Sequence, residues 1–221
     1  MTDRPGLRLY GFWRSMATYR VRVALNLKGV AAEEVAVDLD AGAQLAPAFL
    51  AINPEGAVPA LVIAPGEPPI TQSMAILEYL EERFPEPPLL PADLPGRARV
   101  RSLAALIVSD MHPLIVPRVR AYLTDRAGFD DADFRAWGQH WMTRAVAAFE
   151  ARLAADAETG AFCHGDEVTL ADVCLASFVS VARGFGFARR DTPTVTHIVE
   201  RCEALDAFAR ASPTLQAGAP A

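Results

Sequence analysis

The chain has 221 residues and a formal net charge of −6 at pH 7, which argues against a nucleic-acid-binding surface. With 52% hydrophobic and 22% charged residues, its composition is that of a globular protein and excludes an intrinsically disordered chain. This length is enough for one large domain or two small ones, with an ample core.

Targeting and metal-binding signals are missing from the sequence. Residues 1–7 lack the apolar core of a signal peptide, and the longest nearly apolar run, residues 173–182, is far too short to cross a bilayer. Cys163, Cys174 and Cys202 are odd in number and show neither a CxxC motif nor metal-ligand spacing. We therefore expect a cytoplasmic protein with three reduced thiols, no metal site and no membrane partner.

The first strand is expected at residues 7–12, followed by a turn rich in hydroxyl residues and arginines. Residues 19–28 are ambiguous, because apolar and polar residues alternate there as in a strand. Strong helix formers, with Gly29 as a stop, favour a helix. A strand would also need a turn at 15–18, which contains no Gly, Pro or Asn.

The remainder of the first half predicts a small mixed α/β unit. Strands are expected at 33–39, 58–63 and 69–71, with a short helix at 45–52. A helix capped by Ser73 follows. Its apolar face is predicted to comprise Ile76, Leu77, Leu80 and Phe84, and its polar face Glu78, Glu81 and Glu82.

Residues 85–91, with the sequence PEPPLLP, form a stiff linker, and everything after it has helical periodicity. The expected fold class is α/β plus all-α: a mixed domain at 1–84, the linker at 85–91 and a helical domain at 92–221. Four apolar helix faces are predicted: Val100, Leu103, Ile107, Met111 and Leu114; Phe134, Trp137, Trp141 and Ala145; Leu170, Val173, Cys174, Ser177 and Val181; and Val195, Ile198, Val199, Cys202 and Leu205.

Three features of the first domain suit a peptidic thiol such as glutathione. Ser15 lies at a strand-to-helix turn, where free N–H groups and the helix dipole attract an anion. Val58-Pro59 precedes a strand, and a cis bond there would turn the Val58 N–H and C=O outward to pair with an extended ligand. Gln72-Ser73 opens a helix that can hold a carboxylate.

These features resemble the glutathione transferases, and closely their zeta class, which contains the maleylacetoacetate and maleylpyruvate isomerases. The resemblance covers nearly the whole chain. The matching runs are FWRS (12–15), YRVRVALNLKG (19–29), NPEGAVPAL (53–61), QSMAILEYLEE (72–82), DMHPL (110–114), CHGD (163–166) and TLADVCL (169–175).

The resemblance implies a thioredoxin-like domain followed by a helical bundle, usually as a homodimer. It implies that Ser15 donates a hydrogen bond to the glutathione thiolate, and that Val58 pairs with the glutathione backbone beside a cis Pro59. Gln72 and Ser73 would hold the γ-glutamyl carboxylate, and Gln44 and His112 would make further glutathione contacts. The TLAD run fits a capping box with a role in folding.

Two departures from the class concern the acceptor substrate. Relatives commonly have a second hydroxyl residue where this chain has Met16, and asparagines where it has Ile115-Val116-Pro117. The implied substrate is a small dicarboxylate, so the pocket should contain fixed positive charge. The resemblance makes Arg14 a candidate catalytic residue beside Ser15. Candidate substrate-binding residues are Arg14, Arg118 and Arg183, whereas Arg20 and Arg22 are interpreted as structural or interdomain charges.

The function implied by the resemblance is a glutathione-dependent cis–trans isomerase of maleylacetoacetate or maleylpyruvate in the catabolism of aromatic compounds. One alternative is a general zeta-like transferase that acts on small electrophiles. Another is a non-catalytic glutathione-transferase-like protein that binds ligands or partners. The sequence does not distinguish the two maleyl acids.

Overall fold

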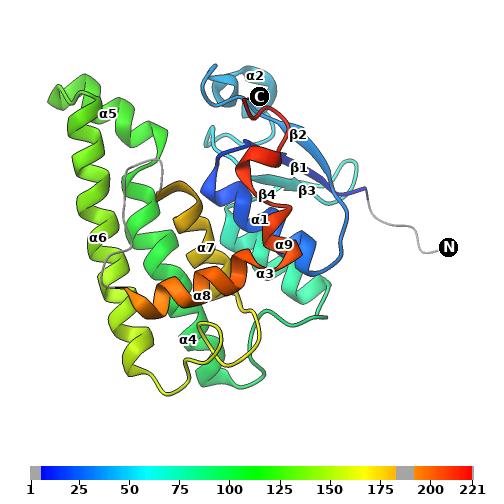
Figure 1. Ribbon diagram of the computed structural model, residues 1–221. Coiled ribbons are helices and arrows are strands. Elements are labelled where there is room, and N and C mark those ends of the chain that lie inside the picture. Colours follow the sequence, from blue (N-terminus) through cyan, green and yellow to red (C-terminus); the bar gives the residue numbers. More distant parts are fainter. Residues whose placement is uncertain (1–5, 183–191, 221) are drawn as a thin grey trace. The chain divides into compact units, whose positions relative to one another are not determined.

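The computed structural model describes residues 6–182 and 192–220, and the chain divides into two compact units (Figure 1). The first unit comprises residues 1–88 and 205–221, and the second comprises residues 89–204. The helical domain predicted at 92–221 is therefore shorter in the structure, because residues 205–221 belong to the first unit.

The first unit is built on a four-stranded sheet in the order β2-β1-β3-β4. Its strands are β1 (Arg8–Gly11), β2 (Glu33–Ala36), β3 (Ala60–Val62) and β4 (Ile70–Thr71), and each lies within its predicted range. β1 and β2 are parallel, whereas β3 is antiparallel to both β1 and β4. This is the thioredoxin-like arrangement that the resemblance implied.

The register brings four chain segments out of the sheet at the same end. Tyr10 of β1 is paired with Ala60 of β3, and Ala60 is paired with Thr71 of β4. Gly11 of β1 is paired with Ala36 of the parallel strand β2. The residues just after β1, β2 and β4, and just before β3, therefore share one edge.

The ambiguous segment is a helix, α1 (Met16–Leu27), as predicted. Its residues are buried from Met16 to Leu25, so an alternating pattern does not mark a strand here. α1 packs against α3 (Ser73–Arg83) and α9 (Asp206–Ala209) of the same unit (Figure 1). A Cβ on Gly11 would lie 2.4 Å from Thr18 Cγ2, so the strand can approach the helix this closely only with glycine.

Two details of α3 differ from the prediction. Ser73 is the first residue of the helix and not its cap, because Gln72 occupies the N-cap position with φ of 68°. Glu81 was expected on the polar face but is 7% exposed. The reason is Lys28, the only lysine of the chain, whose Nζ lies 2.6 Å from Glu81 Oε2 and 2.6 Å from the carbonyl oxygen of Pro87.

The rest of the first unit consists of short elements. η1 (Ala43–Leu45) and α2 (Pro47–Leu50) replace the single helix expected at 45–52. The tail contains α9 and η5 (Pro213–Leu215). Asn26 Nδ2 in α1 donates a 2.8 Å hydrogen bond to the carbonyl oxygen of Ala207, which joins this tail to the first unit.

The second unit is helical, as expected. Its helices are α4 (Leu94–Ala105), the π-helical turn η2 (Leu106–Met111), η3 (His112–Leu114), α5 (Pro117–Ala127), α6 (Asp131–Ala155), α7 (Leu170–Ala182) and α8 (Pro193–Glu203). α7 packs against α4 and α8, and α6 packs against α8. The predicted faces of the first, third and fourth helical segments are largely buried.

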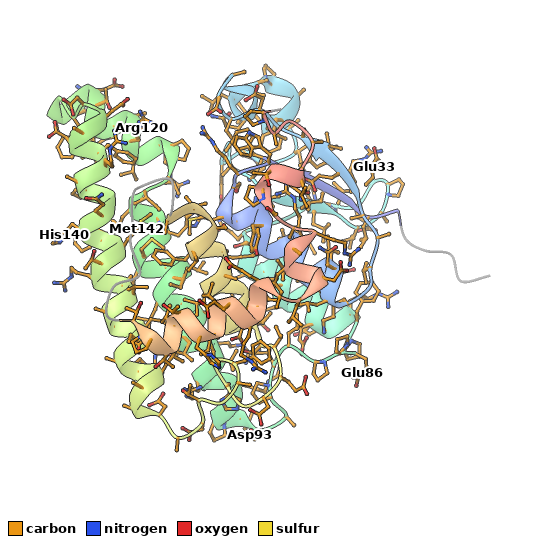
Figure 2. All side chains as sticks on the ribbon, in the orientation of Figure 1. Glu33, Glu86, Asp93, Arg120, His140 and Met142 are labelled. Atoms are coloured by element: carbon orange, nitrogen blue, oxygen red, sulfur yellow. The ribbon has the colours of Figure 1, made fainter. Side chains whose placement is uncertain are left out.

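The apolar face of α6 is rotated from the predicted one. The buried residues are Phe134, Gly138, Met142, Val146, Phe149 and Leu153. Trp137 and Trp141 flank this stripe and form an edge-to-face pair with ring centroids 5.7 Å apart. Figure 2 shows the contrast on α6, where Met142 points into the helical bundle and His140 points away from it.

Asp172 connects the start of α7 to the preceding loop. Its carboxylate accepts hydrogen bonds from the Thr169 amide and hydroxyl and from the Cys163 amide, at 2.7 to 2.8 Å. The Thr169–Asp172 contacts are the carboxylate half of the predicted capping box. Burial raises the pKa of Asp172, although these hydrogen bonds oppose the rise.

Residues Leu94–Ala127 contain an 18-residue window with a mean hydropathy of 1.2, which is long and apolar enough to be considered as a membrane span. In the structure they are divided among α4, η2, η3 and α5, with prolines at positions 113 and 117. A helix from the core of a soluble protein passes the same compositional test, so this stretch is weak evidence for a membrane span.

Candidate functional site

The candidate site lies at the sheet edge where β1, β2 and β4 end and β3 begins. Ser15 follows β1, Gln44 follows β2, Val58 precedes β3, and Gln72-Ser73 follows β4. The pairing of the strands therefore brings Ser15, Val58 and Gln72-Ser73 to one edge, whereas Gln44 lies beyond β2, where its backbone packs against the loop before Val58. The N-termini of α1 and α3 both begin at this edge, and each directs positive dipole charge and free N–H groups toward it.

Ser15 is the N-cap of α1. Its backbone is extended, with φ of −71° and ψ of 122°, and its Oγ accepts a 3.2 Å hydrogen bond from the Thr18 amide. A hydroxyl can accept one bond and still donate its hydrogen, so capping and donation to an anion are compatible. Because capping occupies an oxygen lone pair, it also restricts where the O–H can point.

Arg22 holds the turn that carries Ser15. Its guanidinium donates to the carbonyl oxygens of Trp13 at 3.1 Å and Phe12 at 3.2 Å, in the turn between β1 and α1. The same side chain is 5% exposed and forms an ion pair with Glu34 of β2, with Nε 2.9 Å from Oε2. Arg22 therefore has the structural role that the sequence analysis gave it.

Arg14 is exposed beside this turn and forms an ion pair with Asp40. Its guanidinium carbon lies 5.5 Å from the ring centroids of both Phe12 and Trp13. The side chain is thus held by an acid and two aromatic faces. A substrate carboxylate would have to compete with Asp40 for this charge.

Gln44 and Val58 are both half-buried. The Gln44 Oε1 atom is buried and has no hydrogen-bond partner among the described residues. A Cβ on Gly56 would lie 3.3 Å from the Gln44 carbonyl oxygen, so the loop before Val58 packs directly on the Gln44 backbone. The Val58–Pro59 peptide bond is cis, as the resemblance implied.

Ser73 is buried and hydrogen-bonded to Arg20, which was expected to be a structural or interdomain charge. Arg20, which is fully buried in α1, donates from Nη1 to Ser73 Oγ at 3.1 Å. This contact puts a positive charge directly behind the start of α3, where a carboxylate is expected to bind. Arg20 and Arg22 are both charged residues on a largely buried helix, so burial alone does not single out Arg20 from the sequence.

Two further acids shape the site, and neither was predicted. Glu55 Oε2 accepts a 2.7 Å hydrogen bond from Gln72 Nε2, and Asp40 pairs with Arg14. Both acids lie on loops, so no helix or strand periodicity could have pointed to them.

The remaining predicted residues lie in the second unit or outside the described chain. His112 begins η3 and is half-buried, and Arg118 is exposed in the first turn of α5. Arg183 lies outside the described residues. Met16, the departure from the class, is 3% exposed in the first turn of α1.

The whole chain has known relatives. Residues 5–82 match the family described as "Glutathione S-transferase, N-terminal domain". The chain is 44% identical to a maleylpyruvate isomerase from Ralstonia sp over 95% of this chain and 98% of the relative. It is 47% identical to a maleylacetoacetate isomerase from Rhizobium meliloti (strain 1021), over 93% of this chain and 95% of the relative.

Solved structures agree with these relatives. A maleylacetoacetate isomerase from Methylobacterium extorquens AM1, solved with bound malonate and GSH, is 50% identical, with a TM-score of 0.94 over 97% of this chain and 100% of that one. A maleylacetoacetate isomerase from Anaeromyxobacter dehalogenans 2CP-1, solved with bound dicarboxyethyl glutathione and citrate, is 44% identical. Its TM-score is 0.86 over 98% of each chain. The chain therefore belongs to the glutathione transferase family, in the zeta class that contains the maleylacetoacetate and maleylpyruvate isomerases.

Proposed function

We propose that this protein is a glutathione-dependent cis–trans isomerase that converts maleylacetoacetate to fumarylacetoacetate, or maleylpyruvate to fumarylpyruvate. The observation that carries the proposal is the meeting of Ser15, Val58 and Gln72-Ser73 at one sheet edge, in a chain 44% identical to a maleylpyruvate isomerase. These residues come from three separate segments, and a purely structural relative would not need to keep all three.

Ser15 and the N-terminus of α1 would activate the glutathione sulfur. A free thiol has a pKa of about 8.5, so it is mostly protonated at neutral pH. The Ser15 hydroxyl, with its oxygen already engaged by the Thr18 amide, can donate its hydrogen to the sulfur. That bond and the helix dipole both stabilise the thiolate and so lower the thiol pKa.

The thiolate then adds to one carbon of the cis double bond, which is conjugated with a ketone. The electron pair of the double bond moves onto the ketone oxygen as an enolate, and the former double bond becomes a single bond that can rotate. Collapse of the enolate restores the double bond in the trans form and expels the thiolate. Glutathione is regenerated, and no oxidation or reduction occurs.

The substrate's carboxylates need fixed positive charge, and Arg14, Arg118 and Arg183 are the proposed sources. Relatives crystallised with malonate or citrate support a dicarboxylate-binding pocket. The dicarboxyethyl glutathione in one of them is a thioether between the sulfur and a dicarboxylate carbon. Thiolate addition to an unsaturated dicarboxylate gives a thioether of this type.

The test is an absorbance assay of each cis acid, with and without glutathione, on the wild type and on Ser15→Ala. We expect glutathione-dependent isomerisation of at least one acid by the wild type. If neither acid isomerises faster with the enzyme, the isomerase proposal is wrong. If Ser15→Ala retains full activity, the isomerase proposal survives but Ser15 is not the thiolate donor.

A general zeta-class transferase is the second candidate, because the chain is also 39% identical to a protein named glutathione S-transferase zeta class from Euphorbia esula. Conjugation would stop after the addition step and leave a stable thioether. Mass analysis of the product with a small electrophile separates the two activities. A non-catalytic relative would show neither activity, and failure to bind a glutathione-affinity resin would favour it.

We also propose that the protein is a cytoplasmic homodimer. Its three cysteines are free and buried, which suits a reducing compartment. Large apolar side chains are exposed on the single chain, at Leu45, Leu94, Tyr122 and Leu215. Light scattering of the purified protein tests the dimer directly, and a mass equal to one chain would exclude it.

A further inference from the structure

Gln72 has an unusual backbone conformation for a residue that is not glycine. Its φ of 68° is the only positive value among the non-glycine residues that the structure describes. Left-handed backbone is unfavourable for such a side chain and persists where surrounding contacts hold it. The contact that the structure shows is between Gln72 Nε2 and Glu55 Oε2, at 2.7 Å.

Glu55 is itself presented by an ordered loop. Its amide donates a 3.1 Å hydrogen bond to Oδ1 of Asn53, a side chain that is 2% exposed. Asn53 Nδ2 in turn donates to the carbonyl oxygen of Ala57 at 2.7 Å, and Gly56 takes φ of 59° to complete the turn. Glu55 thus projects from a turn closed by a buried side chain, and its carboxylate is exposed toward Gln72.

The contact also decides which way the Gln72 amide faces. An ionised carboxylate only accepts hydrogen bonds, so the NH₂ group of Gln72 must face Glu55. Gln72 Oε1 is therefore turned away from Glu55 and serves as an acceptor. A carboxylate has about four lone-pair directions, so Glu55 can also accept from a second donor.

Opposite charges consequently lie side by side at the start of α3. On one side, Ser73 has the helix N-terminus and the buried Arg20 guanidinium, which attract a carboxylate. On the other side, Glu55 and Gln72 Oε1 offer only acceptors and one negative charge, which attract an ammonium. An α-amino acid carries both groups on a single carbon.

We propose that Glu55 is a further binding residue, which takes the free ammonium of the γ-glutamyl end of glutathione and orients the Gln72 amide to share it. This inference rests on the proposed function and extends it. The site then recognises a thiol peptide that carries a free α-amino acid group, and it discriminates against thiols that lack the ammonium.

The test compares two ligands on Glu55→Gln by titration calorimetry. The first is glutathione, and the second is the analogue in which hydrogen replaces the γ-glutamyl amino group. We expect Glu55→Gln to raise the Kd of glutathione about 2- to 5-fold, the range for an exposed ion pair, and to leave the Kd of the analogue unchanged. Added salt should weaken glutathione binding more for the wild type than for the variant.

Glu67→Gln is the matched control. Glu67 is exposed in the turn between β3 and β4, at the opposite end of the sheet. Glu67→Gln therefore makes the same change in charge as Glu55→Gln, but away from the site. If Glu55→Gln weakened the binding of both ligands equally, or did not weaken the binding of glutathione, the proposed role of Glu55 would be wrong. If the wild type bound neither ligand, the proposed function itself would fail, and the two failures are thereby distinguished.

Discussion

Arg20 and Ser73 are 53 positions apart in the chain and are joined by a 3.1 Å hydrogen bond from Nη1 to Oγ. The bond connects the middle of α1 to the first residue of α3, so the two helices whose N-termini form the site are tied together. Arg20 has no exposed surface, and its charge acts in a medium that screens it far less than water does.

Replacing Arg20 by Met should weaken glutathione binding more than turnover. The loss of a charge-assisted hydrogen bond is worth roughly 1.5–3 kcal/mol, so we expect the Kd of glutathione to rise at least ~10-fold. The kcat at saturating glutathione should change little, because Arg20 does not touch the sulfur. Calorimetry and steady-state kinetics on the same preparation measure the two effects.

The Ser73→Ala background is the control for this prediction. If Arg20 acts through Ser73, the effect of Arg20→Met should largely disappear once Ser73 is alanine. Additive effects of the two substitutions would show that Arg20 acts independently of Ser73. Arg20→Lys, which keeps the charge, should recover part of the affinity and guards against a simple folding defect.

Capping and thiolate donation by Ser15 can be separated. Asp is as good an N-cap as Ser, whereas Ala costs about 1 kcal/mol. We expect Ser15→Asp to keep the stability of the wild type and Ser15→Ala to lose about that amount in urea unfolding. Both should lose about 10²–10³-fold in kcat, since neither can donate a hydrogen bond to the sulfur.

Asp93→Ala is the companion variant for the Ser15 pair. Asp93 caps α4 through a 2.7 Å bond from the Gly96 amide, within the second unit. Its replacement should cost similar stability and leave isomerisation intact. Full activity in Ser15→Asp would mean that the hydroxyl is only a cap.

Removing one partner of the Lys28–Glu81 ion pair should destabilise the protein strongly, whereas replacing both partners with apolar residues should not. The Lys28 ammonium is fully buried and the Glu81 side chain is 8% exposed. Lys28→Met removes the ammonium that compensates a buried carboxylate, and we expect a loss of roughly 3–5 kcal/mol in urea unfolding. The double variant Lys28→Met with Glu81→Leu should regain most of that stability.

An exposed pair gives the comparison. Arg8 and Glu33 lie 3.1 Å apart with 47% and 64% of their side chains exposed, so Arg8→Met should cost less than ~1 kcal/mol. If Lys28→Met lowers the free energy of unfolding by as little as Arg8→Met does, Lys28 does not compensate a buried charge on Glu81.

Stability should fall at alkaline pH through the buried thiols. Burial raises the pKa of Cys202 above its ordinary value, and the charges of Asp172 and Glu203 raise it further against a smaller opposing effect of Arg201. The unfolded thiol titrates at about 8.5, so above that pH the unfolded state loses a proton that the folded state keeps. The contribution of Cys202 is therefore constant below about pH 8.5 and declines above it, by up to ~1.4 kcal/mol per pH unit.

Urea unfolding between pH 7 and pH 10.5 measures this decline. In Cys202→Ala the free energy of unfolding should decline less steeply above pH 8.5, by up to ~1.4 kcal/mol per pH unit. The variant should also be less stable at every pH, because the substitution leaves a cavity. Parallel curves for the two proteins would show that the folded thiol titrates normally.

Local patterns predicted most of the first unit. The strand positions followed from apolar runs bounded by turns, and α1 followed from helix formers ahead of Gly29 together with the lack of turn residues at 15–18. Ser15, Val58-Pro59 and Gln72-Ser73 followed from helix starts and an X-Pro step, which the strand register brings to one edge. Gln44, His112 and the substrate arginines followed only from the family resemblance.

Partners distant in the sequence explain what was missed. Glu81 looked exposed because nothing nearby reveals that Lys28 lies against it. The tail from residue 205 was expected in the helical domain because its helical pattern is local. Its contact with Asn26, 181 positions away, leaves no local signal in the sequence. On α6, the wide Trp137 and Trp141 rings suggested a buried face, whereas the smaller Gly138 and Met142 occupy it.

The burial of Lys28 and the cysteines has a consequence for an enzyme of this kind. An unsaturated keto acid is an electrophile that alkylates thiols and primary amines. The chain has one lysine and three cysteines, and every one of these four side chains is buried. The folded protein thus has no exposed cysteine thiol or lysine amine that its own substrate could alkylate, and the nucleophilic sulfur is supplied only by glutathione.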